Sequence, residues 1–590
     1  MGDPRKLAAL SLALAVCPLA LCGQTAGPSP FGEKVEVNIV NVEVFVSDKD
    51  GKPVSGLRRG DFELREDGKA MSITNFEAFR QMAAPAAGTP APGTEPAAQD
   101  ASLSSAPAPD PLHLVIYVDN GFLLPAHRNR VLQQLRDFLG QLRPEDEVML
   151  ATADPELSIR ISFTRDRAAL ARSIDEIGKL TSLGLANASA KRQALTQILE
   201  IRDVNSHPLI DSPCDNEIAQ PARFYASAAR AEVLRSLGAM TALASSLSGI
   251  PGRKALLLVS DGMPLTPGEE IFQVLAEICG SRTSGSADAR LSGNGFDLGT
   301  LYDDRQAALD AQGYSAADAF QAFTAHANAQ RVTLYTLQAG GLQGSSSAAA
   351  DLGLNERVAQ LPSVASVETT NLQSSLTLLA GNTGGRAILN ANDLRSDLAH
   401  MQEDFTTYYS LAYAPPHTGD GREHRIEVRV KRPGLRVRSR QSYRDKPSLE
   451  RMADRTLASL FYGIEDNPLE IEVKIGDSAP VDKTTWMVPV RLRIPLFKVT
   501  MLTTETSFEG KLRVLVATGD ASGKRSPLRQ VQVPISIPRA KALVALGQYY
   551  VYEVKLTLEP GEQHVAVAVR DEPTATTSFL ARTLQVGAGL

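Results

Sequence analysis

The chain has 590 residues, of which 43% are hydrophobic and 22% are charged, with a formal net charge of -6. This length exceeds what a single hydrophobic core serves and predicts several domains. The composition is that of an ordinary globular protein, and the slightly acidic balance excludes a nucleic-acid footprint over the whole chain.

The first stretch predicts export. Arg5 and Lys6 precede an apolar run over residues 7–22, which Pro18 interrupts and Gly23 closes. This pattern is typical of a secretory signal peptide, here residues 1–26. The run is shorter than the roughly 20 residues of a membrane anchor. A lipoprotein is the alternative, because residues 19–22 resemble a lipobox. We expect a periplasmic, outer-surface or secreted protein with no transmembrane helix after cleavage.

A β segment follows over residues 33–81. Apolar and polar side chains alternate from Val40 to Val46, which predicts a half-buried strand, and turn signals at residues 48–51 and 66–69 flank a second strand. So few strands need partners from elsewhere in the chain. Residues 82–110 are rich in Ala and Pro and predict a disordered linker.

Strands and helices alternate over residues 111–406. Residues 112–118 and 255–260 are apolar runs without polar alternation, as in parallel strands covered on both faces. Further strands are expected near residues 147–153, 158–163, 332–337 and 387–389, with helices between them. The alternation predicts a doubly wound, mostly parallel α/β sheet. Residues 181–221, 280–313 and 339–367 are expected to be long loops.

The period-two pattern returns over residues 407–446. Residues 426–430 and 435–437 alternate on either side of Pro433 and Gly434, which predicts a hairpin. These strands would complete the β domain, so that the α/β domain is an insertion in it. The segment is rich in arginine. A binding surface for polyanions is one interpretation, and the solvated face of an antiparallel sheet is the one that we favour.

The last part of the chain is predicted to be a separate unit. Residues 447–468 form a helical connector, and residues 469–590 contain seven strand-like runs that predict a β-sandwich with Trp486 in its core.

Two acidic residues follow the two most apolar strands. Asp119, Asn120 and Gly121 come after the first, and Asp261 and Gly262 after the second. Open α/β sheets bind ligands at the carboxyl ends of their strands, so these five residues are predicted to border one binding crevice.

Two cysteines remain after removal of the signal peptide, Cys214 and Cys279. A disulfide between them is the simplest expectation for an exported protein, and two unrelated buried thiols are the alternative.

Several separated motifs resemble one family. They are VNVEVFVSDKDGKPVSGLRRGDFELREDGK (residues 40–69), GRKALLLVSDG (252–262), LAGNTGGRAILNANDL (379–394), YYSLAYAPP (408–416) and VKRPGLRVRSRQSY (430–443). Together with the strand-loop pairs at Asp119 and Asp261, they resemble the acidobacterial-type von Willebrand factor A-related family of exported proteins. The resemblance spans about residues 35–443 and implies a Rossmann-like von Willebrand A domain inserted between strands of a β domain.

The resemblance also implies a metal-ion-dependent adhesion site. Such a site holds Mg²⁺ through an Asp-x-Ser-x-Ser motif, a threonine and a second aspartate, here Asp119 and Asp261. Gly121 and Leu123 stand where the two serines belong, and the threonine is not placed, although Thr181 lies in a suitable segment. The sequence therefore favours a degenerate crevice over an intact magnesium site, and no other cofactor is expected.

The sequence does not predict an enzyme. It contains no His-Glu-x-x-His, no Gly-x-Ser-x-Gly and no phosphate-binding loop. Its eight histidines are scattered, and His207, His326 and His400 have no paired acid at a diagnostic interval. We expect a non-catalytic adhesion or scaffolding protein that binds an unidentified protein partner and no nucleic acid. The alternatives are an envelope assembly factor that acts through its C-terminal β-sandwich, and a magnesium-dependent adhesin.

Overall fold

The computed structural model describes residues 39–80, 111–153, 156–204, 218–280, 304–342, 362–482, 484–520 and 525–587. The predicted signal peptide and the predicted linker at residues 82–110 lie outside the described residues. Cys279 is buried near the end of α5 (Glu269–Gly280). Cys214 also lies outside the described residues, so the disulfide stays a prediction.

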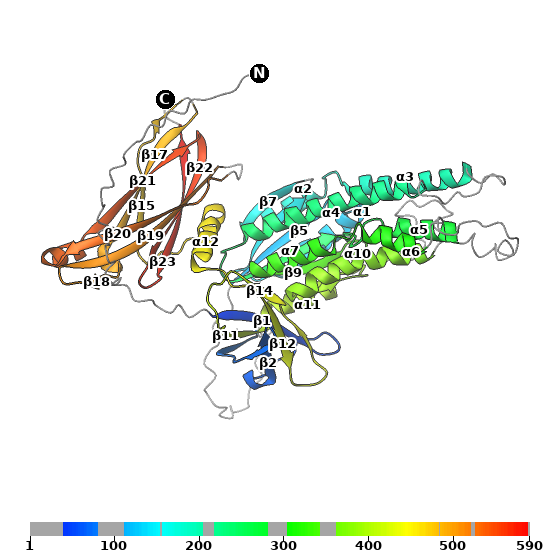
Figure 1. The fold of residues 1–590 in the computed structure, drawn as a ribbon, viewed down its shortest axis with the longest axis horizontal. Helices are drawn as coiled ribbons and strands as arrows, with labels where there is room; N and C mark the ends of the chain where they lie inside the picture. Colours follow the sequence, from blue (N-terminus) through cyan, green and yellow to red (C-terminus); the bar gives the residue numbers. More distant parts are fainter. Residues whose placement is uncertain are drawn as a thin grey trace, which may run out of the picture.

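The chain is a mixed α/β protein with several sheets (Figure 1). Its six-stranded sheet has the order β10-β9-β8-β5-β6-β7, and every neighbouring pair is parallel except β6 and β7. The strands are β5 (Leu112–Val118), β6 (Glu147–Ala153), β7 (Leu157–Thr164), β8 (Arg253–Ser260), β9 (Val332–Gln338) and β10 (Ala387–Ile388). β5 and β8 are almost fully buried, as their apolar runs predict.

Helices cover both faces of this sheet. Leu114 and Ile116 of β5 share a core with α1 (Pro125–Leu139), α2 (Arg167–Ile177) and α11 (Arg395–Thr406). Val115 and Tyr117 point to the other face, where α4 (Gln220–Ser246), α7 (Ala317–Ala329) and α10 (Pro362–Thr383) pack. Side chains alternate along a strand, so a continuous apolar run supplies both cores.

The expectation of three long loops is partly wrong. α3 (Gly184–Val204) occupies much of the first, α6 (Asp304–Gln312) the end of the second, and α10 begins within the third. Together with α4 and α5, helices α3 and α6 enclose a further hydrophobic core. These helices reach beyond the sheet as an extended arm (Figure 1).

Strands from before and after the α/β part pair with one another. One sheet has the order β13-β1-β11-β4 and a second β14-β12-β2-β3, and both contribute to one core. The strands are β1 (Val40–Ser47), β2 (Phe62–Glu66), β3 (Lys69–Met71), β4 (Asn75–Arg80), β11 (Thr407–Tyr413), β12 (Glu423–Val430), β13 (Arg436–Arg438) and β14 (Ser442–Arg444). The predicted hairpin is wrong, because β13 pairs with β1 in one sheet and β12 pairs with β2 in the other.

Four of the eight arginines in residues 407–446 form ion pairs. Arg429 pairs with Glu427, Arg432 with Asp61, Arg438 with Asp404 and Arg444 with Glu450. This pairing weakens the polyanion interpretation.

The C-terminal part begins with helix α12 (Ser448–Tyr462), which packs on β19, β22 and β23. Two antiparallel sheets follow and share one core. Their strands are β15 (Glu472–Ile475), β16 (Ala479–Pro480), β17 (Trp486–Pro495), β18 (Leu502–Thr503), β19 (Ser507–Asp520), β20 (Arg529–Pro538), β21 (Tyr549–Leu558), β22 (Gly561–Asp571) and β23 (Thr577–Val586). Trp486 is only partly buried and packs against this core. No helix in the described part of the chain is long and apolar enough to cross a membrane.

Candidate functional site

The two predicted acidic loops lie side by side. β5 and β8 are neighbouring parallel strands, so Asp119 and Asp261 both follow the carboxyl edge of the sheet. The Asp119 N–H donates to the Val259 carbonyl at 3.0 Å, and the Asp261 N–H donates to the Phe122 carbonyl at 3.2 Å. These backbone bonds fix the loops against each other.

Asp119 is fully buried. Ser260 Oγ donates to its Oδ2 at 3.1 Å, and Ser236 Oγ of α4 donates to its Oδ1 at 3.4 Å. Burial raises the pKa of Asp119 to about 7, and the charge of Asp261 adds to this effect, although both hydroxyls oppose it. The carboxyl group is therefore partly protonated near neutral pH.

Asn120 holds the loop in place. Its Nδ2 donates to the Thr181 carbonyl at 2.6 Å, and its Oδ1 accepts a 2.6 Å hydrogen bond from Arg128. Arg128 is itself buried and also donates to the Gly178 carbonyl at 2.8 Å. These bonds tie the β5 loop to α1 and to the segment after α2.

Asp261 meets the start of α1. Its Oδ2 accepts a 2.9 Å hydrogen bond from the Leu124 N–H, and His127 Nδ1 lies 3.0 Å from both carboxylate oxygens. Gly262 has a φ of +111°, and a Cβ there would lie 2.8 Å from Leu372 Cβ. A larger residue would push α10 away from the loop.

The residues at this edge do not fit a magnesium ion. Leu123 is buried and offers no oxygen, and a Cβ at Gly121 would lie 3.3 Å from Glu232 Oε1. The carboxylates are already engaged, Asp119 by two hydroxyls, Asp261 by an N–H and His127, and Glu232 by Arg235. Within the described ranges, the groups of three or more His, Cys, Asp or Glu able to hold one ion include neither Asp119 nor Asp261.

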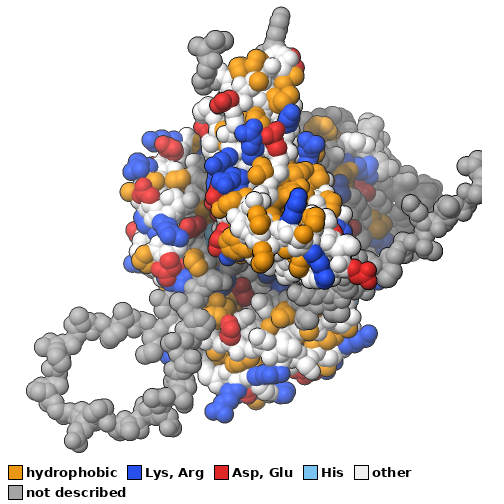
Figure 2. Space-filling model, turned by 90° about the vertical axis from the view of Figure 1, so that its left-hand side faces the viewer, with side chains coloured by type: hydrophobic (Ala, Val, Ile, Leu, Met, Phe, Trp, Pro, Cys, Tyr) orange, Lys and Arg blue, Asp and Glu red, His pale blue; other side chains and the backbone are white. Residues whose placement is uncertain are grey.

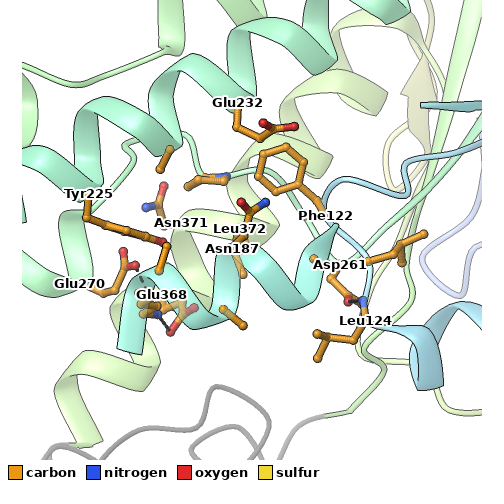
Figure 3. A pocket seen from close by; sticks show the side chains of 18 of the residues that line it. Phe122, Leu124, Asn187, Tyr225, Glu232, Asp261, Glu270, Glu368, Asn371 and Leu372 are labelled. Carbon is orange, nitrogen blue, oxygen red and sulfur yellow. Dashed lines mark hydrogen bonds and ion pairs between the residues drawn. The ribbon is translucent and has the colours of Figure 1, made fainter. Parts of the chain in front are cut away.

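A cavity of about 280 Å³ opens beside these loops. Asp261 and Gly262 line it, whereas Asp119, Asn120 and Gly121 do not. Its apolar surface comes from Phe122, Leu124, Tyr225 and Leu372, on the β5 loop, α4 and α10 (Figure 3). Helix α3, which sequence reasoning placed in a loop, closes another side.

A buried ion-pair triad closes one end of the cavity. Lys191 Nζ of α3 lies 3.2 Å from Glu270 Oε1 of α5 and 2.5 Å from Glu368 Oε2 of α10 (Figure 3). Burial lowers the pKa of Lys191, but the charges of Glu270 and Glu368 outweigh burial and hold that pKa above its ordinary value. Burial raises the pKa of Glu368. The triad joins three helices, and no periodicity or motif in the sequence marks it.

No family model and no curated protein matches the chain. Among solved structures, an aerotolerance-related membrane protein from Bacteroides fragilis is 10% identical over 50% of this chain and 98% of its own, with a TM-score of 0.23. BatB from Bacteroides thetaiotaomicron is 9% identical over 50% of this chain and 97% of its own, with a TM-score of 0.20. Three N-terminal domains of the type V pilus tip protein Mfa5 from Porphyromonas gingivalis are 10% identical over 65% of this chain and 68% of their own, also with a TM-score of 0.20. Likeness at these TM-scores carries no argument about function.

Proposed function

We propose that this is an exported, non-catalytic protein of the cell envelope, which binds a partner protein for adhesion or scaffolding. Its α/β part is of the von Willebrand A-like kind, and its adhesion site has lost the metal. One observation carries the proposal: the ligand-binding edge of the sheet keeps an open cavity, while Asp119 and Asp261, which would hold the metal, are engaged by protein groups.

The lining of the cavity suits a basic side chain of the partner. Its four carboxylates outnumber its two permanent cations, so the lining is net negative even though Lys191 and Arg235 already pair with its glutamates. The carboxylates are those of Glu232, Asp261, Glu270 and Glu368. The aromatic rings of Phe122 and Tyr225 add surface on which a lysine or arginine stem can pack. A metal-dependent adhesion site binds an acidic group through its cation, so loss of the metal reverses the preferred charge.

The same lining supports a non-catalytic role. Its described residues include no serine or cysteine nucleophile, and Lys191 Nζ is held between two carboxylates. His127 pairs with Asp261, which the α1 N-terminus also engages.

A second candidate rests on a different surface. Exposed apolar side chains gather at the end of the C-terminal sheets, which faces the viewer in Figure 2. Leu543 is 90% exposed and Phe497 58%, and the surface also includes Val544, Leu546, Tyr549 and Val551. Exposed patches of this kind mark protein-protein contacts. This surface favours an assembly factor that acts through its C-terminal sheets.

Site-specific photo-crosslinking separates the two candidates. A photoreactive amino acid replaces Phe122 in the cavity, Leu543 in the apolar surface, or Leu309 on α6, an exposed apolar control outside both. The proposal predicts a discrete protein adduct in cells from position 122 and none from 309. An adduct from position 543 alone would favour the assembly factor and contradict the cavity.

A further inference from the structure

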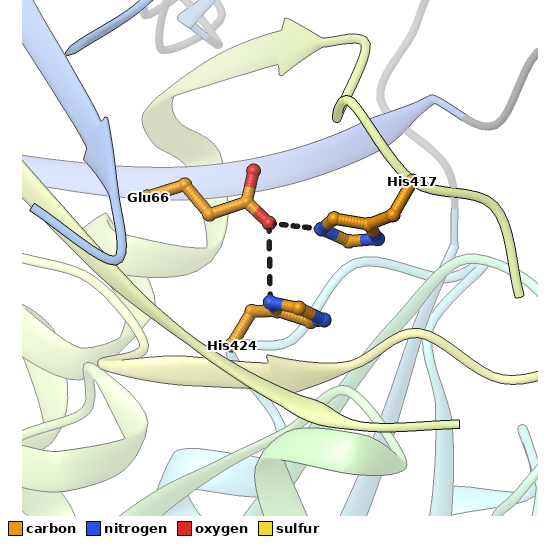
Figure 4. A group of neighbouring side chains, drawn as sticks. All are labelled: Glu66, His417 and His424. Atoms are coloured by element: carbon orange, nitrogen blue, oxygen red, sulfur yellow. Dashed lines mark hydrogen bonds and ion pairs between the residues drawn. The ribbon is translucent and has the colours of Figure 1, made fainter. Parts of the chain in front are cut away.

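A second cluster of polar side chains lies in the β domain, away from the cavity. Glu66 ends β2, His417 lies in the segment between β11 and β12, and His424 belongs to β12 (Figure 4). The strand register brings them together, because β12 pairs with β2 on one side and with β14 on the other. Glu66 and His417 are 351 positions apart in the chain.

Both imidazoles face the same carboxylate oxygen. Glu66 Oε1 lies 2.6 Å from His417 Nε2 and 3.6 Å from His424 Nδ1 (Figure 4). The rings are stacked, with centroids 3.8 Å apart and planes at 14°. One donor atom from each of the three residues lies within 4.8 Å of the other two.

We propose that Glu66, His417 and His424 form a binding site for one zinc ion, which staples the two sequence halves of the β domain together.

The distances suit zinc, and one of the two stacked rings must rotate so that both nitrogen lone pairs aim at the same ion. Ligands at zinc distances in a tetrahedral site lie about 3.3 Å apart, and the two contacts of Glu66 Oε1, 2.6 and 3.6 Å, bracket that value. Asp67 Oδ2 lies 2.9 Å from His424 Nδ1 and is the nearest candidate for a fourth ligand. Two imidazole nitrogens among the donors favour zinc over magnesium or calcium.

The nitrogen of each ring that faces away from Glu66 is held by another carboxylate. His417 Nδ1 lies 2.8 Å from Asp445 Oδ2, and His424 Nε2 lies 3.2 Å from Asp420 Oδ2. Metal-binding histidines commonly pair their second nitrogen with a carboxylate in this way, because the pairing fixes the ring and its tautomer. Tyr443 donates a 2.9 Å hydrogen bond to Glu66 Oε1 and orients that group as well.

Two further observations indicate a missing cation. Glu66 is 2% exposed and its Oε2 is buried. The Tyr413 hydroxyl interacts with this carboxylate but makes no hydrogen bond of regular geometry to it, so Oε2 is poorly compensated. Four carboxylates, those of Glu66, Asp67, Asp420 and Asp445, surround two stacked rings. A dication balances this charge without placing two imidazolium rings face to face.

The test uses the untagged full chain, freed of metal by a chelator and dialysed. Isothermal titration with Zn²⁺ and elemental analysis should find about one zinc per chain, and zinc should raise the melting temperature. Glu66→Gln and His424→Gln should each weaken zinc binding by more than roughly tenfold, and Asp445→Asn by roughly tenfold. His564→Gln is the matched control, because His564 also lies near a glutamate, 3.5 Å from Glu562, but outside the cluster.

A wild-type chain that binds no stoichiometric zinc would overturn the proposal. Folded Glu66→Gln and His424→Gln chains that bind zinc as tightly as the wild type would also overturn it. If either variant fails to fold, Co²⁺ in the wild type gives the answer, since its visible spectrum and histidine NMR signals report nitrogen coordination. Weaker Co²⁺ binding by Asp445→Asn than by His564→Gln supports the site, and equal binding by both contradicts it.

Discussion

Ser260 Oγ donates a 3.1 Å hydrogen bond to Oδ2 of Asp119 and, with Ser236, covers the carboxylate that a metal-dependent adhesion site would present to its ion. Asp119 is thus a buried part of the sheet edge, and the open surface belongs to the residues beside it.

Asp119 should make the α/β part less stable as pH rises. Its pKa is about 7 in the folded chain against an ordinary value of 3.8, so folding favours the protonated form. The corresponding stabilisation is complete below about pH 4 and is lost as pH rises through about 7. The Asn side chain of Asp119→Asn does not titrate. The unfolding free energy of this variant minus that of the wild type should therefore be larger at about pH 8 than at about pH 5, by at least about 1 kcal/mol.

Hydrogen exchange of peptides from β5 and β8, compared between wild type and Asp119→Asn at each pH, measures this difference. Asp482→Asn, in an exposed turn, serves as the control. An Asp119→Asn chain whose protection relative to wild type is the same at both pH values would show that Asp119 titrates normally.

Gly262 should tolerate no side chain. Gly262→Ala adds a Cβ 2.8 Å from Leu372 Cβ at a φ of +111°. Gly561→Ala is the matched control, since Gly561 has a φ of +113° with open space around it. Backbone strain should lower the free energy of unfolding of both variants by about 1–2 kcal/mol. The clash with Leu372 should lower that of Gly262→Ala by about a further 1–3 kcal/mol. Urea denaturation measures the free energies of unfolding, and equal losses would contradict the close approach of α10.

Removing only the cation of the Lys191 triad should destabilise the protein. Lys191→Met leaves Glu270 and Glu368 buried without a partner, which should cost about 3–5 kcal/mol of unfolding free energy. Adding Glu270→Gln and Glu368→Gln removes both unpaired charges and should restore most of the loss. Thermal denaturation of the single and triple variants tests this, and a triple variant no more stable than Lys191→Met would contradict it.

Magnesium should not bind at the sheet edge. Calorimetric titration of Mg²⁺ should give the same heats for the wild-type full chain and for Asp119→Ala, because protein groups already engage Asp119 and Asp261. Micromolar affinity that Asp119→Ala abolishes would restore the intact adhesion site.

The features that depend on local hydrophobic patterns were predictable from the sequence. β5 and β8 were recognisable because both faces of each strand are buried, so the apolar run has no gaps. The adjacency of Asp119 and Asp261 followed from the rule that parallel strands end at one edge.

Other features depend on contacts that pattern does not encode. α3 has no large apolar residue between Leu185 and Leu195. Within that stretch Lys191 looks like a surface charge in the sequence, and only the fold brings the glutamates of α5 and α10 to it. β13 does not form the expected hairpin with β12, because it pairs with β1 in another sheet. The sequence did not indicate the cluster of His417 and His424, since Glu66 is 351 positions from His417 in the chain.

The most direct test of the central claim is the yield of the photo-crosslinked adduct at position 122, measured with purified partner in buffer with and without added Mg²⁺. A metal-free binding cavity predicts the same adduct yield in both buffers and none at position 309. A yield at position 122 that requires Mg²⁺, or no adduct there while position 543 gives one, would contradict the account.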